Sequence, residues 1–233
     1  MAKQKEHKGS QTQAVSLVTL IDPSSPISEQ YRTIRTNIQF ASSTDRPIKT
    51  IVITSSGPGE GKSTTSANLA VVIAKSGQRV LLVDSDMRKP TVYKTFNLMN
   101  ATGLSSVLST STSVLEAAQK TVIDNLFVLT SGPKPPNPSE LLGSERMNQV
   151  IEEARSLYDV VIFDMPPVVA VTDAQIMASK ADGTLLVVRE NVSRKESLSK
   201  AKELLNMVQA HILGVVYNGA EHMKDSGYYY YGN

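Results

Sequence analysis

Short apolar runs alternate with longer segments of helical period along this chain, and the alternation predicts an α/β fold. The runs are rich in Val, Ile and Leu, which is typical of strands covered on both faces. They occur at residues 51–55, 79–84, 126–130, 158–164, 184–189 and 212–217. Helices are expected at residues 28–41, 67–74, 139–158, 172–180 and 193–209. Since one helix-length segment separates the first two runs, we expect those strands to be parallel.

The N-terminal part of the pattern predicts two further features. Residues 16–21 form a short apolar run, which we interpret as a strand packed on the domain. Ser28 is the expected N-cap of the helix at 28–41. This helix has one apolar stripe, formed by Tyr31, Ile34 and Ile38. It has a second, charged stripe, formed by Glu29, Arg32 and Arg35. Such a stripe is usually a solvated face, and the alternative is a contact between subunits.

The first strand of the pattern runs into a glycine-rich turn, then a Lys-Ser pair and an apolar helix. This order is that of a phosphate-binding loop, in which backbone N–H groups point at a phosphate. Lys62 can reach the β/γ-phosphates of a nucleotide, and the Ser63 hydroxyl suits Mg²⁺. Ser56 stands where the strict pattern has its first glycine, so an ordinary strand–turn–helix is the alternative. The expected nucleotide-binding residues are Gly57, Pro58, Gly59, Glu60, Gly61, Lys62, Ser63 and Thr64.

Three aspartates follow predicted strands. Asp84 and Asp86 follow the second strand, and Asp164 follows the fourth. Because the carboxyl ends of parallel strands meet at one edge of a sheet, these side chains should lie beside the phosphate-binding loop. Carboxylates tolerate nucleotide phosphates only with Mg²⁺ between them. Asp164 fits a metal-supporting role. Of Asp84 and Asp86, one could hold metal-bound water while the other faces the hydroxyl that accepts the phosphate. The fold class is therefore α/β, with a P-loop NTPase-like parallel β-sheet, helices on both faces and three layers.

Composition and charge exclude several classes of partner and chemistry. The chain has 233 residues, 40% of them hydrophobic, which suits one α/β domain. Its net charge of +2 is mixed along the sequence and predicts no nucleic-acid partner. Cysteine is absent, which excludes disulfides and thiolate chemistry. No apolar run approaches the roughly 18 residues of a membrane span. We expect a flexible leader at 1–15, the catalytic domain at 16–220 and a flexible tail at 221–233.

The C-terminal tail contains four consecutive tyrosines, Tyr228, Tyr229, Tyr230 and Tyr231. A strand buries only alternate rings, and glycine flanks the cluster on both sides. Exposed phenols on a chain with a nucleotide site suggest phosphoacceptors. Each added phosphate would carry about −1.5 to −2 charges and would change how the tail docks.

At this point the sequence resembles the bacterial tyrosine kinases of capsule and exopolysaccharide synthesis, in their Gram-positive form. The resemblance runs from Glu29 to the tail. It is carried by the segments Glu29–Arg35, Thr54–Thr64, Val83–Pro90, Ser131–Leu142 and Phe163–Pro167 and by the tyrosine cluster. Serine at position 56 is common in that family.

The resemblance implies a non-specific protein-tyrosine kinase that uses ATP and Mg²⁺. Lys62 and Asp86 would act in catalysis together with Asp84, the base toward the tyrosine hydroxyl. Ser63, Asp86 and Asp164 would hold the metal, and Asn218 would contact adenine. The charged stripe would form a ring-shaped homo-oligomer, commonly an octamer, in which the tyrosine tail of one subunit enters its neighbour's active site.

The resemblance also implies a place in the cell and partners. The kinase would be cytoplasmic, at the inner face of the plasma membrane, and a separate transmembrane adaptor would activate it. Its substrates would be tyrosine-containing proteins. Two other functions use the same fold: a partitioning-type ATPase switch and a non-catalytic nucleotide-binding scaffold. ATPases of that type usually carry an extra lysine where this chain has Gly57.

Overall fold

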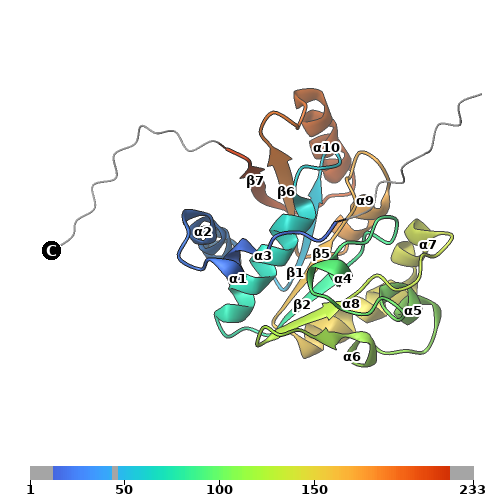
Figure 1. The fold of residues 1–233 in the computed structure, drawn as a ribbon. Helices are drawn as coiled ribbons and strands as arrows, with labels where there is room; N and C mark the ends of the chain where they lie inside the picture. The colour runs from blue at the N-terminus through green and yellow to red at the C-terminus, as the bar shows by residue number, and fades with distance from the viewer. Residues whose placement is uncertain (1–12, 44–46, 221–233) are drawn as a thin grey trace, which may run out of the picture.

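The computed structural model describes residues 13–43 and 47–220, which form three layers around one sheet (Figure 1). The described chain contains seven strands in the order β3-β4-β2-β5-β1-β6-β7. All neighbouring pairs are parallel except β3 with β4, at one edge. The strands are β1 (Thr50–Ser55), β2 (Val80–Asp84), β3 (Gln119–Lys120), β4 (Leu126–Leu129), β5 (Val160–Asp164), β6 (Gly183–Arg189) and β7 (Ile212–Asn218). The predicted fold class is thus confirmed.

Helices cover both faces of the sheet. One face packs against α1 (Val18–Ile21), α2 (Pro26–Ala41), α3 (Lys62–Lys75) and α4 (Val92–Thr95). The other packs against α5 (Leu104–Ser109), α6 (Val114–Ala117), α7 (Pro138–Gly143), α8 (Glu145–Leu157), α9 (Asp173–Ala178) and α10 (Lys195–Met207). Figure 1 shows α3 crossing the front of the central strands, with α2 lying outside it.

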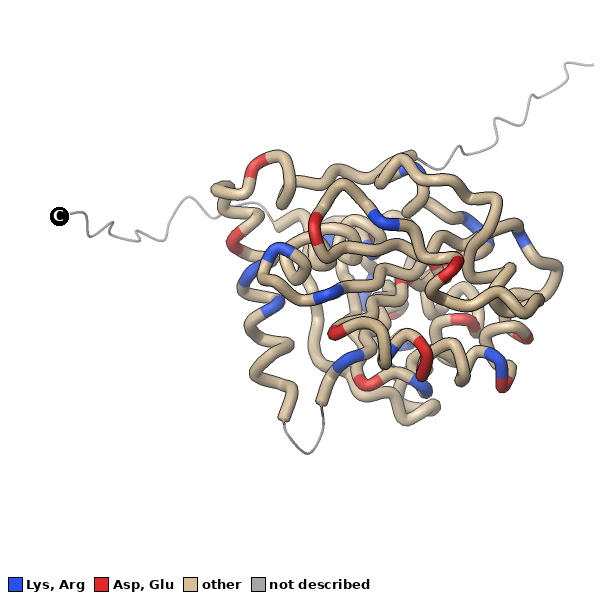
Figure 2. Tube along the Cα trace, turned by 90° about the horizontal axis from the view of Figure 1, so that it is seen from below, with Lys and Arg blue, Asp and Glu red and all other residues tan. Residues whose placement is uncertain are grey.

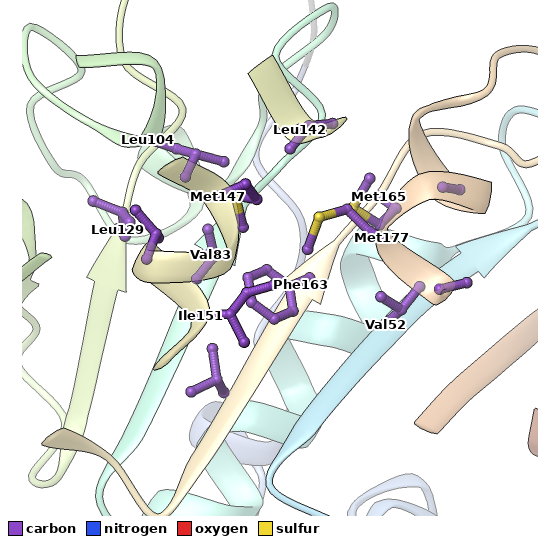
Figure 3. Packing of buried hydrophobic residues seen from close by; sticks show 14 of the residues in the cluster. Val52, Val83, Leu104, Leu129, Leu142, Met147, Ile151, Phe163, Met165 and Met177 are labelled. Atoms are coloured by element: carbon purple, nitrogen blue, oxygen red, sulfur yellow. The ribbon is translucent and has the colours of Figure 1, made fainter. Parts of the chain in front are cut away.

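The strand residues alternate between two apolar clusters because successive side chains of a strand point to opposite faces. In β1, Ile51 and Ile53 join the cluster beneath α3, whereas Val52 joins the cluster beneath α8. On the α8 side, Phe163 lies among Val83, Met147 and other apolar side chains (Figure 3). Both clusters are almost fully buried, so the sheet is covered on both faces and its central strands need no polar side.

Strand register brings two of the aspartates side by side. The parallel pairing of β2 with β5 makes Asp84 the direct partner of Asp164. Both residues continue the side-chain alternation that places Leu82 and Ile162 on the α3 face. The two carboxylates therefore point toward the helix that follows the phosphate-binding loop, at the carboxyl edge of the sheet.

Three expectations about local structure are wrong. The 16–21 run is not a strand: Val18–Ile21 form one helical turn, held by Thr19 through hydrogen bonds to the buried Asn68. The N-cap of α2 is Ser25, because Pro26 takes the first helical position, where a missing N–H costs nothing. The helix expected at 139–158 is two helices, because the Ser144 side chain caps a new start by accepting from Met147 N.

Candidate active site

The glycine turn between β1 and α3 has the backbone of a phosphate-binding loop. Gly59 and Gly61 have φ angles of +77° and +96°, a region that favours glycine. A Cβ on Gly61 would lie 2.5 Å from the Asn218 Nδ2 atom, and the positive φ would strain any larger residue there. The turn leads directly into Lys62 at the first position of α3. The N–H groups of the loop and of the first turn of α3 therefore surround one point, where they can bind phosphate.

Serine at position 56 has a structural reason. Its backbone N–H donates to Glu60 Oε2 at 2.9 Å, and its hydroxyl donates to Glu60 Oε1 at 2.7 Å. Glu60 is buried, with 2% of its surface exposed. A glycine at this position would leave one buried carboxylate oxygen without its donor. Ser56 and Glu60 thus connect the two ends of the loop through two hydrogen bonds.

Lys62 connects the loop to the aspartates. Its Nζ atom donates to Asp86 Oδ2 at 3.1 Å and lies 3.2 Å from Ser63 Oγ. Burial alone would lower the pKa of Lys62, but the carboxylates of Asp164 and Asp86 reverse that effect and raise it. The lysine is therefore a fixed positive charge at this edge of the sheet.

Asp84 and Asp164 are buried completely, and each has one oxygen without a hydrogen-bond partner among the described residues. Asp84 Oδ2 accepts from the backbone N–H groups of Thr91 and Val92 at 3.1 and 3.0 Å, while Oδ1 has no donor. Asp164 Oδ1 accepts from Ser66 Oγ at 3.1 Å, while Oδ2 has none. Burial, together with the Asp164 charge, raises the pKa of Asp84 to about 8. Burial also raises the pKa of Asp164, against the effects of Lys62 and Ser63.

These residues fit a bound magnesium ion. Unpartnered oxygens of adjacent buried carboxylates are a destabilising arrangement that a cation relieves. Within the described ranges, no three His, Cys, Asp or Glu side chains converge as a ready metal cage. Mg²⁺ does not need one, because it usually binds one or two carboxylates, a hydroxyl and phosphate oxygens and keeps several waters. The predicted ligands Ser63, Asp86 and Asp164 supply that kind of set.

Arg88 contacts protein rather than an open phosphate site. Its Nε and Nη2 atoms each donate to Asp173 at 3.0 Å, and Nη2 also donates to Ser139 Oγ at 3.1 Å. The Ser139 hydroxyl in turn donates to Asp173 Oδ1 at 2.6 Å. Arg88 follows the second strand, where an arginine either steadies phosphates or forms an ion pair, and the structure shows the ion pair. Asp173 was missed, because the sequence marked it only as the start of a helix.

The remaining predicted residues fall into three places. Asn218 ends β7 and donates to the Glu60 carbonyl and to Thr65 Oγ1, both at 3.2 Å, so it borders the loop. Glu29 and Arg32 form an ion pair on α2, and the Nε atom of Arg35 is buried without a partner in the described chain. The tyrosines at 228–231 and residues 1–12 of the leader expected at 1–15 lie outside the described residues.

Charged residues of both signs are spread over the described chain. Basic and acidic residues are interspersed along the trace, with no single-sign stripe in the view of Figure 2. Within the described ranges, no helix is both long enough and apolar enough to cross a membrane.

Comparison with known proteins identifies close relatives. Residues 48–214 match the family model described as an AAA domain. Tyrosine-protein kinase YwqD of Bacillus subtilis (strain 168) is 51% identical over 98% of this chain and 95% of its own length. A putative tyrosine-protein kinase, CapB of Staphylococcus aureus, is 42% identical over 90% of this chain and 91% of its own. The solved structure of the chimerical protein CapA2B2 superposes with a TM-score of 0.82 at 44% identity, covering 89% of this chain and 92% of that one.

Proposed function

The chain belongs to the bacterial tyrosine-protein kinases of the capsule-synthesis type, and we propose that it transfers the terminal phosphoryl group of ATP to tyrosine hydroxyls. One structural observation supports this proposal independently of the relatives' names. The lysine of the phosphate-binding loop, three aspartates and a serine hydroxyl all lie at the carboxyl edge of the sheet, where phosphoryl transfer needs positive charge and metal ligands.

In the proposed reaction the chain mainly positions the nucleotide phosphates and neutralises their negative charge. The loop N–H groups and Lys62 hold the phosphates of ATP, and Asn218 borders the side where adenine would lie. Ser63, Asp86 and Asp164 hold the metal. Magnesium, when bound, neutralises the charge that develops on the transferred group. Gly59 and Gly61 have positive φ angles that other residues adopt only with strain, so the loop backbone is set to follow one path around the phosphates.

Asp84 is the proposed base toward the tyrosine hydroxyl. A pKa of about 8 makes it a better proton acceptor near neutral pH than an ordinary aspartate would be. Its Oδ2 is already held by two backbone donors, so the unpartnered Oδ1 is the atom available for a proton. Asp84 is fully buried and Asp86 is 5% exposed, which makes Asp86 the alternative base. The rates of Asp84→Asn and Asp86→Asn as a function of pH distinguish the two. A base acts only when it is deprotonated, so removing it abolishes the rise in rate on the acidic side of the profile.

The proposal also covers the substrates, the assembly and the cellular location of the chain. The tyrosines at 228–231 are the proposed acceptors, delivered by a neighbouring copy in a ring of eight. The stripe of Glu29, Arg32 and Arg35 is the proposed contact between copies. A transmembrane adaptor would hold the kinase at the cytoplasmic face of the plasma membrane and activate it. A longer relative supports this: a tyrosine-protein kinase of Salmonella typhimurium (strain LT2) matches this chain over only 31% of its own length.

A phosphotyrosine assay tests the core of the proposal. Purified protein is incubated with Mg-ATP, with and without the cytoplasmic segment of the adaptor, and phosphotyrosine is located by mass spectrometry. We expect phosphate on residues 228–231, none in Lys62→Ala, and none in a variant with all four tyrosines replaced by Phe. ATP hydrolysis without any phosphotyrosine would favour the ATPase switch. Nucleotide binding without either reaction would favour the scaffold.

A further inference from the structure

The segment that carries Asp84 and Asp86 folds around its own carboxylates. Residues 85–91 connect β2 to α4 without regular structure. Lys89 N donates to Asp86 Oδ1 at 3.0 Å, and the N–H groups of Thr91 and Val92 donate to Asp84 Oδ2. One oxygen of each carboxylate is thus held by the backbone of this segment, so whatever fixes the segment also helps to fix the carboxylates.

Arg88 attaches this segment to two other elements. Its guanidinium makes a two-point contact with Asp173, in the first turn of α9, and a further contact with Ser139, in the first turn of α7. The Asp173 carboxylate is completely buried, whereas the Arg88 side chain is 37% exposed. A planar guanidinium bound at two points fixes orientation as well as distance, which a lysine ammonium does not do. The backbone between Asp86 and Lys89 is therefore fixed to the layer that contains α7 and α9.

We propose, building on the kinase function above, that Arg88, Asp173 and Ser139 are positioning residues that hold Asp84 and Asp86 in place for phosphoryl transfer. Within the described residues, the hydrogen bonds and ion pair of these three side chains do not include the phosphate-binding loop. They act through the 85–91 segment, as outer partners of metal ligands do. Loss of such partners typically costs about 10–100-fold in metal affinity or activity.

A purely structural ion pair is the competing explanation, and the chain contains a matched control for it. Arg155 Nη1 donates to Asp182 Oδ2 at 2.6 Å, with side chains 25% and 21% exposed. This second Arg–Asp pair lies at the opposite edge of the sheet, where Asp182 also accepts from the Thr50 and Lys49 backbones at the start of β1. Arg155→Gln therefore removes a comparable ion pair far from the candidate site.

The first test needs no activity. Hydrogen exchange of the metal-free protein follows the peptide that contains Lys89, Thr91 and Val92. In Arg88→Gln we expect protection of these N–H groups to fall at least about tenfold, while Arg155→Gln leaves this peptide unchanged. Arg88→Lys should keep part of the protection, because it restores the charge without the two-point geometry. Equal exchange in Arg88→Gln and the wild type would overturn the proposal.

The second test separates chemistry from binding. With saturating Mg-ATP, Arg88→Gln should form phosphotyrosine about 10–100-fold more slowly and need more Mg²⁺ for its half-maximal rate. Its affinity for a fluorescent ATP analogue without metal should change less than about threefold. Asp173→Asn should show a smaller loss, because the amide still accepts one hydrogen bond. Equal losses in Arg88→Gln and Arg155→Gln would refute positioning. A wild type that makes no phosphotyrosine would instead refute the kinase function, and the exchange test would still decide the role of Arg88.

Discussion

Replacing Asp84 by Asn should stabilise the metal-free protein while abolishing phosphoryl transfer. The carboxylate is fully buried beside Asp164 and has one oxygen without a donor. The variant's amide oxygen can keep the hydrogen bonds from Thr91 and Val92. Its NH₂ group provides a donor on the side of the register partner Asp164, whose Oδ2 has none. The substitution therefore removes a buried charge and leaves the packing unchanged.

The magnitude follows from the pKa of Asp84. Folding raises this pKa from 3.8 to about 8. Protons then bind more strongly to the folded state, so stability is highest below about pH 4 and falls as the pH rises toward 8. At about 1.36 kcal/mol per pKa unit the full penalty is about 6 kcal/mol. Relaxation and entry of water reduce this, and we expect Asp84→Asn to gain about 2–4 kcal/mol at pH 8.5 and less than about 1 kcal/mol at pH 4.5.

Urea unfolding in EDTA measures this gain at both pH values. A useful control is Asp182→Asn, which should have the opposite sign. Burial raises the pKa of Asp182, but hydrogen bonds from Thr50, Lys49 and Arg155 outweigh burial and lower it. Asp182 thus stabilises the fold above its unfolded pKa, and its loss should destabilise the protein at neutral pH. If Asp84→Asn gave the same change at pH 4.5 and 8.5, or a loss that grew with pH, the buried-charge argument would be wrong.

Three further predictions follow from contacts described above. Gly61→Ala should abolish nucleotide binding, measured by fluorescence titration, because a Cβ would lie 2.5 Å from the Asn218 amide at a φ of +96°; binding within threefold of the wild type would contradict this. Asn68→Ala should lower the free energy of unfolding by about 2–3 kcal/mol, since it removes the buried hydrogen bonds to Thr19 and to the Ser16 and Thr64 carbonyls; a loss below 0.5 kcal/mol in urea unfolding would show that water replaces them. Light scattering should show a reduced mass when alanine replaces the charged stripe of α2, Glu29, Arg32 and Arg35, and an unchanged mass would remove the stripe as the contact between copies.

The sheet was predictable from sequence because its strands are buried on both faces. Each of the six strands predicted from the alternating pattern corresponds to a strand of the structure within two residues at either end. The strand at 16–21 was wrong because a six-residue apolar run has no period that separates strand from helix. Its helical turn depends on Asn68, which is distant in sequence. The short elements β3, α4, α5 and α6 were not predicted, since each is too short to show a period.

The location of the candidate site was predictable for a different reason. Residues that follow parallel strands must gather at one edge, so the approach of Asp86 to Lys62 and of Asp84 to Asp164 follows from topology. The positions of single hydrogen-bond partners do not follow from it. Asp173 lies nine residues after Asp164, and nothing in its neighbourhood marks it as the partner of Arg88. Glu60 likewise reads as a loop residue until its burial beneath Ser56 is seen.

The division of the apolar interior by the sheet has a consequence for how this kinase tolerates mutation. Side chains beneath α3 and those beneath α8 do not share a packed volume, since the strand backbones lie between them. Truncations such as Ile53→Val and Ile151→Val should therefore sum in their effects on unfolding free energy. Where a pair fails to sum, the strand backbones or an edge of the sheet must couple its members, so double-mutant cycles across the two layers would map which residues respond together.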